Sequence, residues 1–277
     1  MDNITVIIPY YNRKNSIQHA VDSVLAQTHQ NLQIIIVDDG SIEPLESFGG
    51  DRITIIRHDT NKGAAAARNT AIQATKTDWI AFLDSDDLWQ KDKLEQQLKF
   101  MVAHNINAST TYALFGDKKR ELPDVIGKPA VLGGQGINFG SCFMCKRNLF
   151  DEVGLLDESL SRLEDWDWLI RFVNLGHDIH TVPFYGSIIQ VGSPPSIEAV
   201  NSSAQNIVHK YKKSQRVQAA AMVEIAANNL WHGKLCGFIQ YWVKAFFLSP
   251  LLALNFVWTR IKRISGGDAP RFFKLFR

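Results

Sequence analysis

Apolar runs of strand length alternate with segments of helical periodicity over the first hundred residues of this 277-residue chain. The runs are rich in isoleucine and valine and lie at residues 4–9, 32–37, 53–56 and 79–83. Between them, amphipathic or alanine-rich segments of helical spacing lie at residues 15–28, 63–75 and 91–104. Continuously apolar strands separated by helices are typical of a parallel sheet covered on both faces. The sequence therefore predicts an α/β fold with a Rossmann-like, mostly parallel sheet.

Polar clusters follow three of these predicted strands. They are "PYYN" at residues 9–12, "DDGS" at 38–41 and "DSDD" at 84–87. Ligands of open α/β sheets bind beyond the carboxyl ends of the strands, and parallel pairing brings these ends to one edge. The three clusters therefore predict a ligand site at that edge.

The "DSDD" cluster supports two interpretations. Asp84 and Asp86 flank a serine, so on an extended backbone they point the same way and can share one cation. Carboxylate oxygens suit Mg²⁺ or Mn²⁺, which leave positions for substrate phosphates. A helix N-cap is the alternative, and Asp87 fits it, but a cap needs only one acid.

Three further motifs each have a structural and a functional interpretation. "VDDGS" is a turn, or a carboxylate that accepts a hydrogen bond from a nucleobase. Arg68 lies in the first turns of an alanine-rich helix, where it is either solvated or bound to phosphate. The acids of "LEDWDWLIRF" either stabilise the start of a helix or include a general base beside aromatic rings. Neither G-x-G-x-x-G nor the phosphate-binding loop G-x-x-x-x-G-K-[ST] is present, which argues against dinucleotide binding and ATP hydrolysis.

Taken together, "VIIPYYN", "VDDGS", "NKGAAAARN", "LDSDD" and "LEDWDWLIRF" resemble glycosyltransferase family 2 in order and spacing along residues 1–190. The resemblance implies a nucleotide-diphospho-sugar transferase fold of the GT-A type and an inverting sugar transfer. It implies a nucleotide site of Pro9, Tyr11 stacked on the base, Asp39 at the base edge, Arg68 and Asp84. It also implies a metal site for Mn²⁺ or Mg²⁺ at Asp86, with Asp87 assisting.

The resemblance also implies that Asp165 deprotonates the acceptor hydroxyl, with its neighbour Glu164 as the second choice. One departure concerns the stretch after the last predicted strand, where many relatives carry a histidine. Here "IIQVGSPPS" has none.

The second half of the chain is less regular. The glycine-rich residues 125–141 predict a mobile loop, and residues 200–230 predict helix. Residues 235–258 carry one charge, Lys244, but Pro250 argues against a membrane span. Within them Phe238, Tyr241, Trp242, Ala245 and Phe246 form a predicted apolar stripe opposite Gln240 and Lys244.

Charge divides the chain in two. Residues 209–277 carry twelve Lys or Arg and two acids, a net charge of +10, whereas residues 1–208 carry −8. We therefore expect a catalytic domain at 1–208 and a helical, basic and aromatic region at 209–277 that meets a membrane surface. The alternative is that these helices pack on the catalytic domain. Nucleic acid is not an expected partner, because the aromatic residues form no recognised binding pattern.

Three cysteines and an N-terminus without a signal-peptide pattern favour a cytoplasmic protein, peripheral on the inner face of the membrane. The expected function is metal-dependent transfer of a sugar from a nucleoside-diphosphate sugar to a hydroxyl of a glycan or lipid-linked acceptor, in bacterial surface polysaccharide synthesis. A UDP-sugar is favoured, since uracil offers an N–H to Asp39; thymine offers the same N–H, and guanine is a further alternative. Two alternatives stay open: a nucleotidyltransferase that makes sugar nucleotides, and a membrane-surface scaffold with a decayed site.

Overall fold

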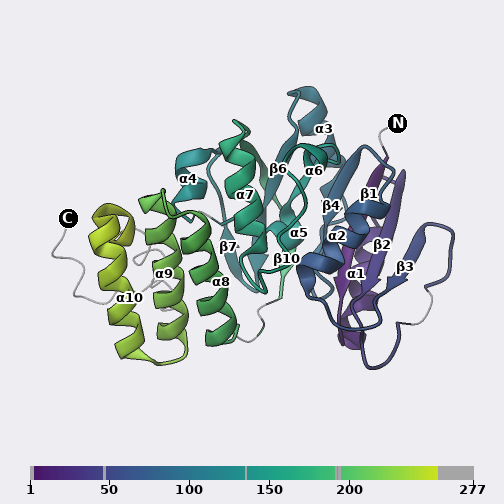
Figure 1. Cartoon of the computed structure of the whole chain (residues 1–277). Helices are drawn as coiled ribbons and strands as arrows, with labels where there is room; N and C mark the ends of the chain where they lie inside the picture. The colour runs from purple at the N-terminus through teal and green to yellow at the C-terminus, as the bar shows by residue number, and fades with distance from the viewer. Residues whose placement is uncertain (1–2, 46–47, 135, 191, 193–194, 255–277) are drawn as a thin grey trace. The chain divides into compact units, whose positions relative to one another are not determined.

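The computed structural model describes residues 3–45, 48–134, 136–190, 192 and 195–254 (Figure 1). The chain divides into two compact units. Unit 1 comprises residues 1–131 and 135–192, and unit 2 comprises residues 132–134 and 193–277. The predicted boundary after residue 208 is wrong, because it falls inside a helix of unit 2, Ile197–Lys210.

Unit 1 is built on a 10-stranded sheet whose main path runs β3-β2-β1-β4-β9-β6-β10-β5. The first four strands pair in parallel: β1 (Ile4–Tyr10), β2 (Leu32–Asp38), β3 (Ile53–Arg57) and β4 (Trp79–Phe82). The others are β5 (Leu88–Trp89), β6 (Ala108–Phe115), β7 (Lys118–Arg120), β8 (Val125–Ile126), β9 (Met144–Lys146) and β10 (Ile179–Ile189). β9 runs antiparallel to both β4 and β6, whereas β10 is parallel to β6. The α/β prediction is confirmed, with a mixed sheet whose parallel N-terminal half carries the predicted ligand edge.

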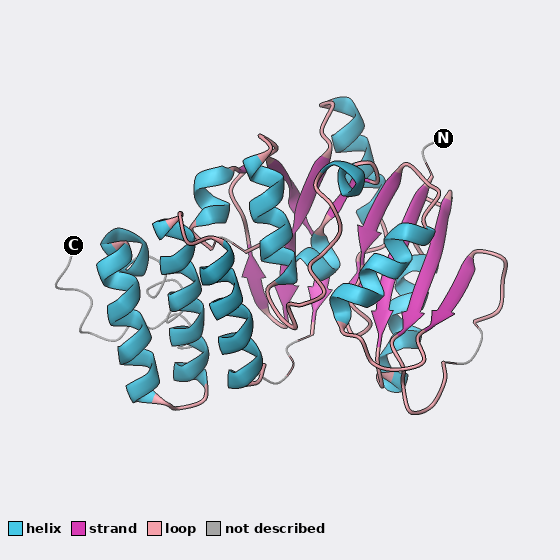
Figure 2. Ribbon diagram, in the orientation of Figure 1, coloured by secondary structure: helices cyan, strands magenta, loops and turns pink. Residues whose placement is uncertain are grey.

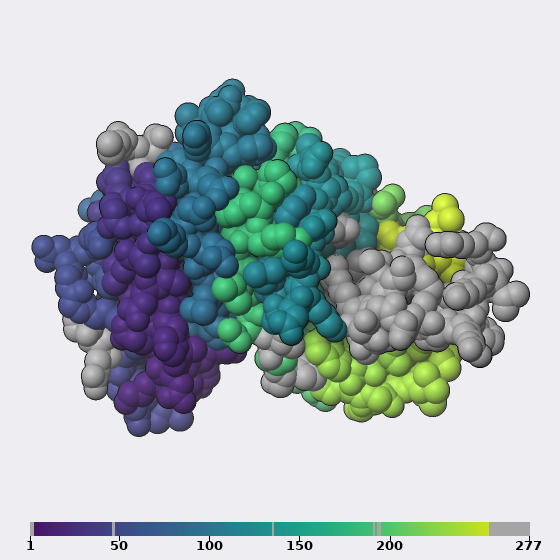
Figure 3. All heavy atoms as spheres, turned by 180° about the vertical axis from the view of Figure 1, so that it is seen from behind, coloured from purple at the N-terminus to yellow at the C-terminus, as the bar shows by residue number. Residues whose placement is uncertain are grey.

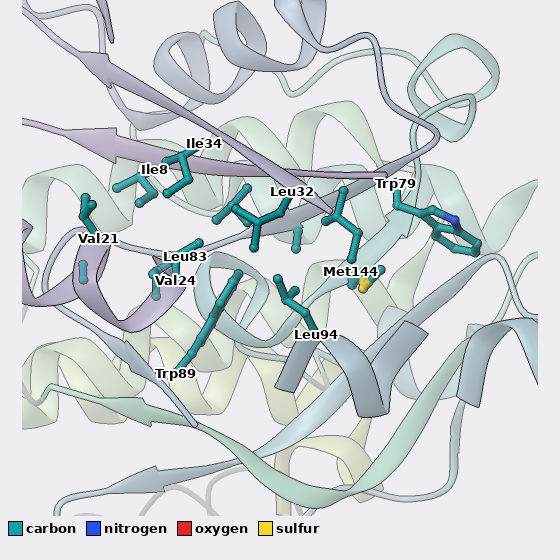
Figure 4. Packing of buried hydrophobic residues seen from close by; sticks show 14 of the residues in the cluster. Ile8, Val21, Val24, Leu32, Ile34, Trp79, Leu83, Trp89, Leu94 and Met144 are labelled. Carbon is teal, nitrogen blue, oxygen red and sulfur yellow. The ribbon is translucent and has the colours of Figure 1, made fainter. Parts of the chain in front are cut away.

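Helices cover both faces of this sheet (Figure 2). On one face, α1 (Lys14–Leu25) and α3 (Lys93–Ala103) share one apolar core with alternate residues of β1 and β2, and α3 lies against β6 and β10. Figure 4 shows part of this core, with Val24 of α1, Trp89 of β5 and Leu94 of α3 converging. The Gln27 amide joins the two helices, donating to Gln90 O (2.8 Å) and accepting from Leu94 N (3.0 Å). Figure 3 shows the molecule from behind. There the purple surface of the N-terminal residues borders the blue surface of the residues that come after β4 in the chain.

The opposite face carries α2 (Ala64–Ala74), α6 (Leu149–Glu152) and α7 (Glu164–Asn174). Aromatic side chains fill the space under α7. Trp168 is fully buried, with its ring 4.9 Å from that of Phe150 and 5.2 Å from that of Phe172. This aromatic core fixes the start of α7 relative to the sheet.

The prediction of a mobile loop at residues 125–141 is wrong for the described residues of that stretch. They include β8, α4 (Lys128–Leu132) and the beginning of α5 (Phe139–Cys142). Phe139 stacks on Phe143 and packs against Phe82. Burial of one aromatic ring therefore anchors a segment whose glycines had indicated a loop.

The described part of unit 2 includes the helices α8 (Ile197–Lys210), α9 (Gln215–Trp231) and α10 (Leu235–Leu248). α9 lies between the other two (Figure 1). The prediction of helix over about 200–230 is confirmed, with a break between α8 and α9 where Ser214 caps a new N-terminus by accepting a hydrogen bond from Val217 N. No described helix is both long and apolar enough to cross a membrane. The basic, Phe-rich residues 255–277 lie outside the described residues.

Lys93 is a buried lysine that the sequence did not single out. It is fully buried, and among the described residues its Nζ has no hydrogen-bond partner and lies 3.9 Å from the centroid of the Trp89 ring. Burial lowers the pKa of Lys93 to about 7. Between that value and the pKa of an exposed lysine, the unfolded chain binds more protons than the folded one, so stability rises with pH in this window.

Lys93→Met should therefore raise the free energy of unfolding at pH 7, because the cost of losing the lysine's proton on folding disappears while the apolar stem remains. We expect a gain of about 2 kcal/mol that shrinks as the pH approaches 10. Urea unfolding at several pH values measures it. The exposed Lys99 of the same helix provides the control, and an equal effect of Lys99→Met would contradict the assignment.

Candidate active site

The carboxyl ends of β1 and β2 are joined by hydrogen bonds. Asp39 N donates to Tyr10 O (2.8 Å), and Asn12 N donates to Ser41 Oγ (2.9 Å). The structure thus brings "PYYN" and "DDGS" together, as the parallel register requires. Pro9 is partly buried and Tyr11 is 44% exposed, so the Tyr11 ring is open to a ligand.

Asp39 is buried and holds the loop that precedes α2. Its Oδ1 accepts from His58 Nδ1 (2.7 Å) and Lys62 N (2.9 Å), and its Oδ2 accepts from Gly63 N (2.8 Å). Gly40 follows with φ +70°, and a Cβ there would lie 2.4 Å from Thr60 C. The turn that "VDDGS" indicated is present at Gly40, and Asp39 has structural partners that the sequence did not reveal.

The three acids of "DSDD" have separate partners. Asp84 Oδ1 accepts from Arg68 Nη2 (2.8 Å), and Asp86 pairs with Arg13. Asp87 is 3% exposed and accepts from Ser141 Oγ (2.5 Å) and Gln190 N (2.8 Å). Their mutual repulsion is therefore offset by two arginines and by buried donors.

Neither sequence interpretation of Asp87 fits its position. Both of its carboxylate oxygens are engaged inside the protein, so it does not face a ligand. It does not cap a helix either, since α3 begins six residues later at Lys93. Burial and the nearby Asp84 raise the pKa of Asp87 to about 7.

Ser141, in α5, is a positioning residue that the sequence did not single out. Its Oγ accepts from Asp84 N (3.1 Å) and donates to Asp87. Its carbonyl oxygen accepts from Trp89 Nε1 and Ser187 Oγ, both at 2.7 Å. The preceding Gly140 allows Asp84 to approach, because a Cβ there would lie 2.2 Å from Asp84 Oδ2. The only sequence signal was the glycine before a buried strand.

Arg68 links two acidic clusters that are about eighty residues apart in sequence. It donates from Nη2 to Asp84 and from Nη1 to Glu164 Oε1, each at 2.8 Å. Its side chain is 8% exposed, so this is a largely desolvated ion network. The sheet edge and the start of α7 therefore belong to one site.

The first turn of α7 presents Glu164 and Asp165 from a strained backbone. Leu163, at the N-cap, has φ +66°, a conformation that residues other than glycine rarely adopt and that clusters at functional sites. Burial and the adjacent Glu164 raise the pKa of Asp165 to about 6, and Arg68 opposes this rise. A carboxylate with such a pKa can accept a proton near neutral pH.

Trp166 and Trp168 do not offer a face to a sugar. They are 7% and 0% exposed, and their indole nitrogens donate to Val131 O and Gly154 O. Both rings belong to the core beneath the site.

The carboxylates at the sheet edge fit a divalent cation that takes most of its ligands from substrate phosphates and water. Asp84 and Asp86 are 38% and 24% exposed and offer oxygen donors. Among the described residues, no three or more His, Cys, Asp or Glu side chains are arranged to hold a metal ion. Mg²⁺ and Mn²⁺ sites with one or two carboxylates, completed by phosphate and water, match this arrangement.

The model of the family described as "Glycosyl transferase family 2" matches residues 5–154, more than half of the chain. The chain belongs to glycosyltransferase family 2. All of the "PYYN", "DDGS" and "DSDD" motifs lie inside the match, whereas Glu164 and Asp165 lie beyond it.

Relatives within this family cover parts of the chain. A putative teichuronic acid biosynthesis glycosyltransferase, TuaG of Bacillus subtilis, is 40% identical over 136 residues, 47% of this chain and 54% of the relative. The Escherichia coli UDP-Glc:alpha-D-GlcNAc-diphosphoundecaprenol beta-1,3-glucosyltransferase WfaP is 32% identical over 180 residues, 61% of this chain and 69% of the relative. An uncharacterized glycosyltransferase of Rickettsia felis is 44% identical over 127 residues, 44% of this chain, but the match spans only 21% of that relative.

Two solved structures show the same fold. S. aureus TarS 1–349 in complex with UDP superposes with a TM-score of 0.59 at 16% identity, covering 88% of this chain and 91% of that one. The mannosyltransferase PcManGT from Pyrobaculum calidifontis, in complex with GDP-Man and Mn²⁺, gives a TM-score of 0.58 at 18% identity, covering 92% and 79%. These likenesses confirm the predicted GT-A type fold.

Proposed function

We propose that this chain is a metal-dependent, inverting glycosyltransferase that moves a sugar from a nucleoside-diphosphate sugar to a hydroxyl group. The observation that carries the proposal is the Asp84–Arg68–Glu164 network, which joins a donor-side acid to the acids of α7. In relatives of known structure, UDP and GDP-Man with Mn²⁺ are the bound molecules.

The donor nucleotide lies along the strand ends in this proposal. Pro9 and Tyr11 flank the base, and the exposed Tyr11 ring stacks on it. Asp39 is 3% exposed and accepts three hydrogen bonds within the protein, so in this proposal it shapes the base edge by holding the loop ahead of α2. Uracil remains the favoured base, because TarS is solved with UDP and WfaP is named for UDP-Glc. Asp84 and Arg68 contact the ribose and the diphosphate.

Asp84 and Asp86 would hold Mn²⁺ or Mg²⁺, whereas the buried Asp87 binds Ser141 Oγ and Gln190 N instead. When bound, such an ion neutralises the diphosphate and acts as a Lewis acid for the leaving group. Arg13 is 52% exposed, so it can turn away from Asp86 into solvent.

Asp165 takes the proton of the acceptor hydroxyl. Its Oδ1 accepts from Trp166 N (2.7 Å), so we assign the proton to Oδ2. The hydroxyl oxygen bonds to the anomeric carbon as the bond from that carbon to the diphosphate oxygen breaks, which inverts the configuration. Glu164, bound to Arg68, orients the network instead of accepting the proton.

The acceptor in this proposal is a glycan or a lipid-linked sugar of bacterial surface polysaccharide synthesis. The support comes from relatives, because TuaG is named for teichuronic acid biosynthesis and WfaP for a diphosphoundecaprenol-linked acceptor. Such an acceptor lies at a membrane surface, where the proposed enzyme works from the cytoplasmic side.

A thermal-shift panel of nucleoside diphosphates tests the donor site. With Mn²⁺, the preferred nucleotide at about one hundred times its Kd should raise the melting temperature by about 5 °C. Asp86→Asn should abolish the part of this rise that depends on the metal, whereas Asp117→Asn, an exposed acid outside the site, should leave it unchanged. If no nucleoside diphosphate raises the melting temperature with Mn²⁺ or Mg²⁺, the proposal fails.

A further inference from the structure

Four large apolar residues of α10 are exposed along one line of the helix. Leu235, Ile239, Val243 and Phe247 recur every four residues and are 58%, 49%, 38% and 82% exposed. We call these four residues the outer stripe. Beyond the break at Ser249, Leu251 and Leu254 are also exposed, at 77% and 42%. Single exposed apolar residues are ordinary, but a continuous row marks an interaction surface.

The outer stripe is not the apolar stripe expected from the sequence. The predicted stripe faces α9: Ala245 is fully buried, and Phe238, Tyr241, Trp242 and Phe246 are partly buried. Gly237 lets the two helices approach closely, since a Cβ there would lie 2.3 Å from Asn229 Oδ1. α10 therefore has two apolar faces, and the core of unit 2 uses only one of them.

The charge around the outer stripe identifies the kind of surface that would cover it. Lys234 precedes α10 and Lys244 lies within it, and the helix contains no acid. Residues 195–254 contain six Lys or Arg against two Glu, and the sequence after residue 254 adds six Lys or Arg against one Asp. A second copy of the chain would bring the same positive charge to the contact, whereas an anionic lipid surface has the opposite charge.

We infer that the outer stripe is the surface by which the chain rests on an anionic lipid bilayer. Its apolar side chains enter the boundary between headgroups and acyl chains, while the lysine ammonium groups stay among the lipid phosphates. The 14-residue helix lies flat over about 20 Å of membrane surface. The lipid contact itself does not depend on the proposed function. Its role does, because we expect the contact to bring the enzyme to a lipid-linked acceptor.

Vesicle co-sedimentation of the full chain tests the inference. The chain should sediment with phosphatidylcholine vesicles that contain phosphatidylglycerol, and less with phosphatidylcholine alone. Ile239→Gln/Phe247→Gln should weaken binding to the anionic vesicles at least about tenfold, because two buried apolar side chains are lost. The matched control is Val102→Gln/Leu175→Gln, which makes the same kind of change at exposed residues of unit 1.

Two further measurements make each outcome decisive. The stripe variant should keep the melting temperature and the metal-dependent nucleotide shift of the parent, so loss of vesicle binding is separated from unfolding and from failure of the proposed function. Unchanged vesicle binding in the stripe variant overturns the inference. It is also overturned if the parent is a dimer in light scattering and the stripe variant a monomer, because a second copy then covers the stripe. A marked fall in the variant's melting temperature without lipid has the same consequence, since the stripe is then covered by the chain itself.

Discussion

Asp165→Asn is expected to lower turnover about a thousandfold while nucleotide binding stays unchanged. The asparagine keeps the shape and the hydrogen bond from Trp166 N but cannot take the proton of the acceptor hydroxyl. Initial rates of sugar transfer measure the loss, and nucleotide titration by calorimetry measures what is retained. Glu164→Gln should cost less, because Glu164 acts through Arg68.

The rate of sugar transfer should depend on pH through the protonation of Asp165. A base must be deprotonated to act, and the pKa of Asp165 is raised to about 6 by burial and by Glu164. The rate should therefore fall as the pH decreases through about 6 and level off above it, and the residual rate of Asp165→Asn should lack this step. A full acid limb in the variant would assign the proton to another group.

Arg68→Met should cause the largest loss of stability among the site variants. It leaves the 12% exposed carboxylate of Glu164 without its cation and also removes the partner of Asp84, which is 38% exposed. Removing one partner of a buried ion network costs about 3 kcal/mol or more. Urea unfolding should show this loss, whereas Arg147→Met, which breaks the exposed pair with Asp151, should cost less than about 1 kcal/mol.

The same variant separates a positioning role from a merely structural one. Arg68 lowers the pKa of Asp165 by its positive charge, so its removal should move the acid limb of the rate profile to higher pH. Glu164→Gln should move the limb in the opposite direction, since the glutamate raises that pKa. Equal profiles in all three proteins would show that Arg68 and Glu164 only hold the fold.

Local patterns predicted the parallel half of the sheet because its strands are apolar on both faces and their helices have clear periodicity. They failed where tertiary packing decides the structure. The ring of Phe139 anchors a glycine-rich segment. Which face of α10 is buried depended on α9, because both faces are apolar.

The candidate site was predictable to the extent that strand ends converge. The ends of β1 and β2 meet as the parallel register predicts. Arg68 and Glu164 were placed in one site with Asp84 by the family resemblance, since neither lies at a strand end. The partners of Asp87 could not be foreseen, because Ser141 and Gln190 lie more than fifty residues away in sequence. The same holds for Asp39, whose carboxylate binds the backbone ahead of α2.

The most direct test of the proposed function is to identify the product released from the donor. With Mn²⁺, a nucleoside-diphosphate sugar and a lipid-linked glycan acceptor, the chain should release nucleoside diphosphate in proportion to the sugar transferred. That release should stop with EDTA and in Asp165→Asn. Pyrophosphate released from a nucleoside triphosphate and a sugar phosphate would show a nucleotidyltransferase instead. The absence of any metal-dependent release across the panel of donors and acceptors would contradict the account.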